Sequence, residues 1–108
     1  MNYVDELKAN GPWRYGLSCH MFPEITDIEK GDLSEFHKFA QSIGLKREWF
    51  QKGSWPHYDL NKTIRAKAVK AGAIEITSRD MARQVLTFKT NIKDSGKNIK
   101  EILDKVYQ

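Results

Sequence analysis

The chain has 108 residues, of which 40% are hydrophobic and 30% are charged, a size and composition that fit one small globular domain. Cys19 is the single cysteine, which excludes an internal disulfide and fits a reducing compartment. No stretch approaches the ~18 apolar residues of a membrane-spanning helix. Asp5 and Glu6 stand where a signal peptide would carry positive charge. We therefore expect a cytoplasmic protein without a membrane partner.

The net charge of +4 is distributed unevenly along the chain. Residues 1–54 contain 7 Lys/Arg and 8 Asp/Glu, whereas residues 55–108 contain 11 and 6. A basic half is compatible with an anionic partner, although a solvated lysine-rich helix face is the commoner cause. Nucleic acid is the weakest of the partner hypotheses, because the chain contains no recognised nucleic-acid-binding motif.

The first elements in chain order are two short strands and a helix. Residues 1–5 contain β-favouring side chains, and residues 17–22 alternate in polarity, so both are predicted to be strands. Apolar residues at helical spacing predict a helix over residues 33–43, with Asp32 as its cap and Gly44 at its end.

The middle of the chain is predicted to contain a second helix. A short helical turn is expected over residues 46–50, and a loop then leads to His57. Asp59 or Asn61 can cap a helix that ends at Gly72.

The pattern of strand and helix is repeated once more. Residues 73–77 form a β-prone run, and Ser78 is predicted to cap a helix over residues 79–88. Strands alternating with helices predict a single small α/β domain, in which helices pack on a short, partly parallel sheet. We assign residues 1–88 to this core and residues 89–108 to a C-terminal helical extension.

The extension carries one apolar stripe on a lysine-rich amphipathic helix, formed by Ile99, Ile102, Leu103 and Val106. Such a stripe must be covered, either by the core of the same chain or by a second copy. Cover by its own core is the simpler interpretation, and a homodimer through the C-terminal helix is the alternative.

Two helix starts are candidate anion-binding sites, because unpaired backbone N–H groups at such starts bind anions. One start is Thr77-Ser78-Arg79, and the other is His57-Tyr58-Asp59 followed by Arg65. If the sheet brings both starts to one edge, a phosphate can be held by Ser78, Arg79, His57, Tyr58 and Arg65. The competing interpretation is that Ser78 is only a cap and that the arginines are solvated or paired.

The three histidines, His20, His37 and His57, could bind Zn²⁺ together with Asp59. Their spacing does not support this, because no two lie three or four residues apart and the chain has no Cys-x-x-Cys. We therefore predict no metal site and no cofactor, with His37 as a hydrogen-bonded, half-buried helix residue. Cys19 and His20 are strand neighbours that point to opposite faces, which argues against a nucleophile–base pair.

Four aromatic side chains are candidates for stacking on a nucleobase: Trp13, Trp49, Trp55 and Tyr58. Trp49 lies close behind the first helix and is expected to pack. Trp13 and Trp55 are each next to a proline and are less obviously buried.

Several strings together carry a resemblance to a known family. They are Pro12-Trp13-Arg14, Cys19-His20-Met21, Phe36-His37-Lys38-Phe39-Ala40, Ile43-Gly44-Leu45-Lys46-Arg47-Glu48-Trp49-Phe50-Gln51 and Pro56-His57-Tyr58-Asp59-Leu60. With Arg65, Ala68, Gly72-Ala73 and Thr77-Ser78-Arg79, they resemble a small family of bacterial and phage proteins known as domain of unknown function 4031. The resemblance covers about residues 1–86. It departs from the family at Ser18, where a tryptophan is usual, and in the tail.

The resemblance implies a site built from characteristic polar positions, without adding an activity. These positions are Arg14, His20, His37, His57, Tyr58, Asp59, Arg65 and Arg79.

Two functions are compatible with these residues. The first is binding of a small anionic, nucleotide-like ligand, through which a phage protein could sequester a nucleotide signal in the host cytoplasm. Its ligand-binding residues would be Trp13, Arg14, His20, His37, His57, Tyr58, Arg65, Ser78 and Arg79. The alternative is a small phosphodiesterase-like hydrolase. Its catalytic residues would be His20, His57, Tyr58 and Asp59.

Overall fold

The structure is a computed structural model of the chain and describes residues 1–9, 16–53 and 55–107. Four short strands form one sheet in the order β3-β2-β1-β4. Strand β2 is antiparallel to both β1 and β3, whereas β1 and β4 are parallel. The predicted α/β class with a partly parallel sheet is therefore confirmed. The strands are β1 (Tyr3–Val4), β2 (Ser18–Phe22), β3 (Tyr58–Asn61) and β4 (Ile74–Glu75).

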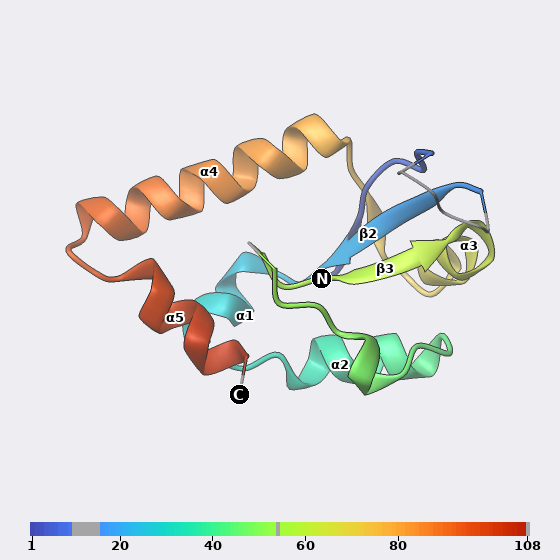
Figure 1. The fold of residues 1–108 in the computed structure, drawn as a ribbon, viewed down its shortest axis with the longest axis horizontal. Coiled ribbons are helices and arrows are strands. Elements are labelled where there is room, and N and C mark those ends of the chain that lie inside the picture. Colours follow the sequence, from blue (N-terminus) through green and yellow to red (C-terminus); the bar gives the residue numbers. More distant parts are fainter. Residues whose placement is uncertain (10–15, 54, 108) are drawn as a thin grey trace.

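Helices surround the sheet and extend beyond it (Figure 1). None within the described residues is long and apolar enough to cross a membrane. The helices are α1 (Ile25–Lys30), α2 (Ser34–Ser42), the 3-10 turn η1 (Arg47–Trp49), α3 (Lys62–Lys70), α4 (Ser78–Asp94) and α5 (Ile99–Val106).

The two faces of the sheet differ in character. One face is apolar, with the buried side chains Val4, Cys19, Met21, Tyr58 and Leu60. Helix α2 packs there, and the centre of its Phe36 ring lies 5.4 Å from the centre of the Tyr58 ring. Helix α3 contacts three of the strands. The other face, which we call the open face, carries Asp5, His20 and Asp59. Alternation along each strand thus places these polar groups on the side away from the α2 packing, where the buried ring of Phe22 also lies.

The cap predicted for α3 is confirmed, and the caps predicted for α2 and α4 are wrong. The N-cap of α2 is Leu33 and not Asp32, whose carboxylate accepts from the N–H and the hydroxyl of Ser34, the first residue of the helix. Asn61 accepts a hydrogen bond from the backbone N–H of Ile64 at 2.8 Å. The cap of α4 is Thr77 and not Ser78, because the Thr77 hydroxyl accepts from the Asp80 N–H at 3.0 Å. Helix α4 also continues six residues beyond the predicted end at residue 88. The expected boundary between core and extension therefore lies within this helix.

Helix α1 was not predicted, and it is the element on which α5 packs. It is only six residues long and ends at Gly31, whose φ is 74°. A Cβ at Gly31 would lie 3.3 Å from the Cβ of Lys105, so glycine also allows the close approach of α5. The apolar stripe of α5 packs against the core of the same chain, and Val106 is buried there.

Candidate metal centre

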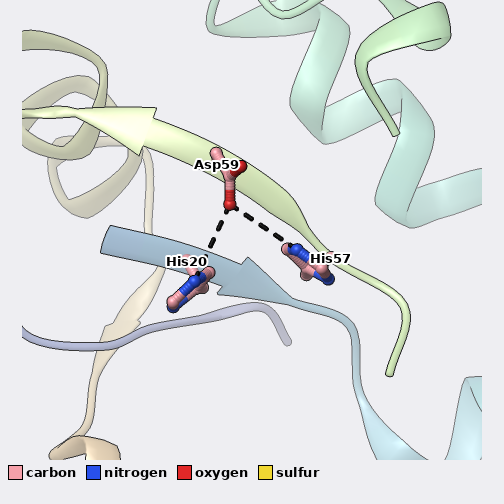
Figure 2. Close-up of side chains that lie close together, drawn as sticks. All are labelled: His20, His57 and Asp59. Atoms are coloured by element: carbon pink, nitrogen blue, oxygen red, sulfur yellow. Dashed lines mark ion pairs between the residues drawn. The ribbon is translucent and has the colours of Figure 1, made fainter. Parts of the chain in front are cut away.

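Three polar side chains come together on the open face of the sheet. His20 on β2 is the direct cross-strand partner of Asp59 on β3. His57 precedes β3 and is held by a backbone bridge to Gln51. Figure 2 shows the Asp59 carboxylate directed toward both imidazole rings, with His20 on the neighbouring strand β2 and His57 on the same segment of chain as Asp59. The three residues are therefore positioned by backbone pairing.

The distances match those between ligands of one metal ion. Asp59 Oδ1 lies 3.7 Å from His20 Nε2 and 3.5 Å from His57 Nε2. One ligand atom from each residue lies within 4.8 Å of the others. Tetrahedral coordination with bonds of about 2.1 Å places ligand atoms about 3.4 Å apart. Small side-chain movements are therefore enough to close these three groups around an ion.

Each imidazole is also fixed from its other side. His57 Nδ1 donates to the Trp55 carbonyl oxygen at 2.7 Å, and His20 Nδ1 lies 3.0 Å from Asp5 Oδ2. A carbonyl oxygen only accepts, so the His57 proton is on Nδ1 and the lone pair of the neutral ring is on Nε2. Metal-binding histidines are typically held in this way by a carboxylate or a backbone carbonyl. The Gln51 amide donates to Asp59 Oδ2, which orients the third group.

Asp5 and His20 form a hydrogen-bonded pair in which the Asp5 side chain is buried and the His20 side chain is 39% exposed. Burial by itself raises the pKa of Asp5, but hydrogen bonds from the ring and the backbone N–H of His20 bring it below its usual value. The hydrogen bond to Asp5 raises the pKa of His20, against the opposing effect of burial. Asp5 therefore remains a carboxylate that can hold the His20 ring in place.

The other predicted site residues on β3 and α2 lie on the opposite face. Tyr58 is fully buried, and its hydroxyl oxygen lies 2.8 Å from His37 Nδ1. Burial, followed by the charge of Arg47, lowers the pKa of His37 to about 4. The structure thus pairs the buried Tyr58 with the half-buried His37, as predicted for His37, and the sheet separates both from His20 and His57.

The predicted basic cradle for a phosphate does not assemble from the described residues. The Arg65 guanidinium binds the Asp5 carbonyl oxygen and the Glu75 carboxylate, each through a contact of about 3 Å. Arg79 is exposed on the first turn of α4. The Ser78 hydroxyl lies 3.4 Å from Asp5 Oδ2 and so is linked to His20 only through Asp5. Trp13 and Arg14 lie outside the described residues.

Comparison with known proteins identifies a family over most of the chain. The model of the family described as "Protein of unknown function (DUF4031)" matches residues 3–87. The chain belongs to this family. No curated protein and no solved structure gave a significant match. Within this DUF4031 chain, the matched residues include His20, His57 and Asp59, whereas α5 lies beyond them.

Sequence spacing did not predict this metal-like arrangement. Ligands three or four residues apart belong to sites on one helix, whereas His20 and Asp59 are brought together by strand pairing. The alternation in residues 17–22, together with the polar residue at every second position from His57 to Asn61, was the available signal. The pairing partner and register of two such strands do not follow from spacing alone.

Cys19 is outside the site, as its position next to His20 predicted. It is buried on the apolar face, and burial is the main cause that raises its pKa to about 12. A thiol with such a pKa remains protonated at neutral pH and is a poor nucleophile.

Proposed function

We propose that the open face binds a divalent transition-metal ion through His20, His57 and Asp59, and that the site hydrolyses a small anionic, nucleotide-like phosphoester. The observation that carries this proposal is the orientation of the two histidines. Both Nδ1 atoms are held by protein oxygens, and both Nε2 atoms lie within 4 Å of the same Asp59 oxygen. Two histidines and one carboxylate are a recurrent ligand set of catalytic metal ions.

The position of the three groups leaves room for substrate. The His20, His57 and Asp59 side chains are 39%, 17% and 32% exposed, so the ligand set is open to solvent on one side. A metal ion at such a site lowers the pKa of a bound water and polarises a phosphoryl oxygen. In the reaction, the oxygen of water forms a bond to phosphorus and the ester P–O bond breaks. One proton of the water ends on the released hydroxyl group.

Basic residues at the borders of the site favour an anionic substrate. Lys8 is close enough to His20 for its charge to oppose, in part, the rise in the His20 pKa that the hydrogen bond to Asp5 causes. Lys89 of α4 lies with Nζ 5.9 Å from the centre of the Trp55 ring. Positive charge near the site raises the local concentration of an anion and offsets the charge of its phosphate.

A second candidate function is capture of the same anionic ligand without turnover, as in sequestration of a nucleotide signal by a phage protein. This candidate is supported by the fact that both carboxylates in the described part of the site already have partners. Asp5 is hydrogen-bonded to His20 and Ser78, and Asp59 belongs to the proposed ligand set. Neither carboxylate is therefore available as a separate general base.

The two candidates are separated by incubating the Zn²⁺-loaded chain with a panel of nucleotides and sugar phosphates and identifying the recovered compounds by chromatography. Hydrolysis predicts new products that form only with Zn²⁺, whereas capture predicts a retained, unchanged ligand. Asp59→Asn should abolish either result. Asp94→Asn, the same change on an exposed residue at the end of α4, should preserve it. A panel from which nothing is converted or retained would contradict both candidates.

A further inference from the structure

A hollow of about 620 Å³ borders the proposed metal site on the side of the outer strand β3. We call it the edge hollow. Asp59 belongs to both the hollow and the proposed ligand set, so a molecule in the hollow lies directly beside the metal position. A volume of this size is typical of pockets for small organic ligands. The hollow is lined by Leu45, Trp49 and Ile64 on its apolar side and by Glu48, Gln51, Asn61 and Asp59 on its polar side.

Trp49 is the most unusual residue of the edge hollow. Its side chain is 48% exposed, although the sequence predicted that it would pack. It is placed on the short turn η1, and Lys46 Nζ lies 5.5 Å from the centre of its ring. An aromatic ring that lines a hollow and remains half-exposed provides a surface on which a flat ring can stack.

Two side-chain amides line the same hollow, and each uses only one of its two polar groups in a hydrogen bond with a described residue. Gln51 uses its NH₂ group on Asp59, and Asn61 uses its oxygen to cap α3. No described residue binds the opposite halves, which are the Gln51 carbonyl oxygen and the Asn61 NH₂ group. One acceptor and one donor beside an aromatic ring match the edge of a heterocyclic base.

The charge of the hollow decides which end of a nucleotide it would receive. The carboxylates of Glu48 and Asp59 line it, and none of its described lining residues is basic, since Lys46 contacts the Trp49 ring without lining the hollow. A phosphate is therefore disfavoured inside the hollow, whereas an uncharged base with N–H donors is compatible with a carboxylate. The phosphate would instead lie at the metal position, close to Lys8.

We infer that the edge hollow is a base-binding subsite, which makes the substrate or captured ligand of the proposed metal site a nucleotide. The base stacks on Trp49, its edge is bound by Gln51 and Asn61, and its phosphate reaches the metal position beside Asp59. This inference rests on the proposed metal-dependent function for the phosphate half of the molecule.

The test compares binding of four nucleoside monophosphates (AMP, GMP, CMP and UMP) with binding of ribose 5-phosphate, by calorimetry on the full chain with and without Zn²⁺. At least one nucleotide should bind tenfold or more tightly than ribose 5-phosphate. Trp49→Leu should remove about tenfold of affinity for that nucleotide and leave ribose 5-phosphate unchanged, since stacking on one aromatic ring has about this effect.

Leu86→Ala is the matched control. Leu86 is a 66% exposed apolar residue in a second hollow of about 330 Å³, formed by α4 and the open face. The preference for the nucleotide should survive this change. A preference that is absent, that is undiminished in Trp49→Leu, or that disappears in Leu86→Ala would overturn the assignment of the base to the edge hollow.

The two proposals fail in different ways. If only the metal site is wrong, the corresponding free nucleoside still binds in a Trp49-dependent manner, and ribose 5-phosphate shows no Zn²⁺-dependent binding. If only the base subsite is wrong, ribose 5-phosphate binds in a Zn²⁺-dependent manner, and the base adds no affinity.

Discussion

Asp5 is the residue whose position gives His20 its role. It is buried at the end of β1, accepts from the backbone N–H of His20 at 2.6 Å and lies 3.0 Å from the ring nitrogen Nδ1. We infer that Asp5 is a positioning residue, which orients the ring without contacting the metal. The loss of such a partner typically weakens metal binding by about 10- to 100-fold.

Asp5→Asn should therefore lower the affinity for Zn²⁺ by about 10- to 100-fold, because a neutral amide holds the imidazole less firmly. A competition titration with a chelator measures this change. Glu6→Gln is the control, since Glu6 is exposed and its one hydrogen bond among the described residues is to the backbone N–H of Ser78. An Asp5→Asn chain that binds Zn²⁺ as tightly as the wild type would show that Asp5 has no positioning role.

His37 makes stability depend on pH from the opposite face of the sheet. Its pKa is about 4 in the folded chain and 6.5 in the reference state, mainly because of burial. Between these values the unfolded chain binds a proton that the folded chain does not bind. The free energy of unfolding therefore falls as the pH is lowered from 6.5 to 4, by at most about 3 kcal/mol.

His37→Gln should remove this dependence, because glutamine does not titrate and keeps a polar group near the Tyr58 hydroxyl. We expect the wild type to lose more stability than the variant on acidification from pH 6.5 to pH 4, with no such difference between pH 7 and pH 8. Urea denaturation of both chains at these pH values measures the difference. Parallel pH profiles would contradict the shifted pKa of His37.

Among the elements, α5 covers α1 and thereby extends the core. Its partly buried residues Ile99, Ile102 and Leu103 pack against the core, and the Tyr107 hydroxyl donates to the Lys52 carbonyl oxygen at 2.6 Å. The contacts of α5 with α1 and α4 close one end of the molecule (Figure 1). They support cover by the same chain, whereas a homodimer through this helix remains a proposal.

Leu103→Asp should lower the melting temperature without changing the molecular mass in solution, because a charge on the packed side of α5 costs about 2 kcal/mol or more. Lys100→Ala, on the exposed side of the same helix, should change the melting temperature little. Thermal melts and light scattering test both variants. A halved mass for Leu103→Asp, with unchanged melting, would instead show that the stripe joins two copies.

At the scale of the whole molecule, the sequence predicted most helices and strands, but it did not predict which of them lie side by side in the fold. Hydrophobic periodicity located α2, and periodicity together with the Asn61 cap located α3, because a helix is stabilised by residues close in sequence. Six-residue α1 has too few turns to show a period. The convergence of His20 with Asp59 depends on strand register between segments about forty residues apart, which local patterns do not specify.

The same limit explains why the residues that were expected together lie on two faces. Tyr58 and Asp59 are adjacent in sequence, yet one is fully buried with His37 and the other is part of the open face. Side chains alternate between the faces of a strand, so a string such as His57-Tyr58-Asp59 always divides in this way. The division follows from the sequence once residues 58–61 are known to be a strand.

The most direct test of the account is the stoichiometry and affinity of Zn²⁺ binding to the purified chain. We predict one ion per chain, with affinity reduced at least 100-fold in His20→Gln and in His57→Gln. His37→Gln, the same substitution on the opposite face, should bind Zn²⁺ like the wild type. Circular dichroism of each variant confirms that it is folded. Absence of stoichiometric binding, or equal binding by all three folded variants, would contradict a metal centre at His20, His57 and Asp59.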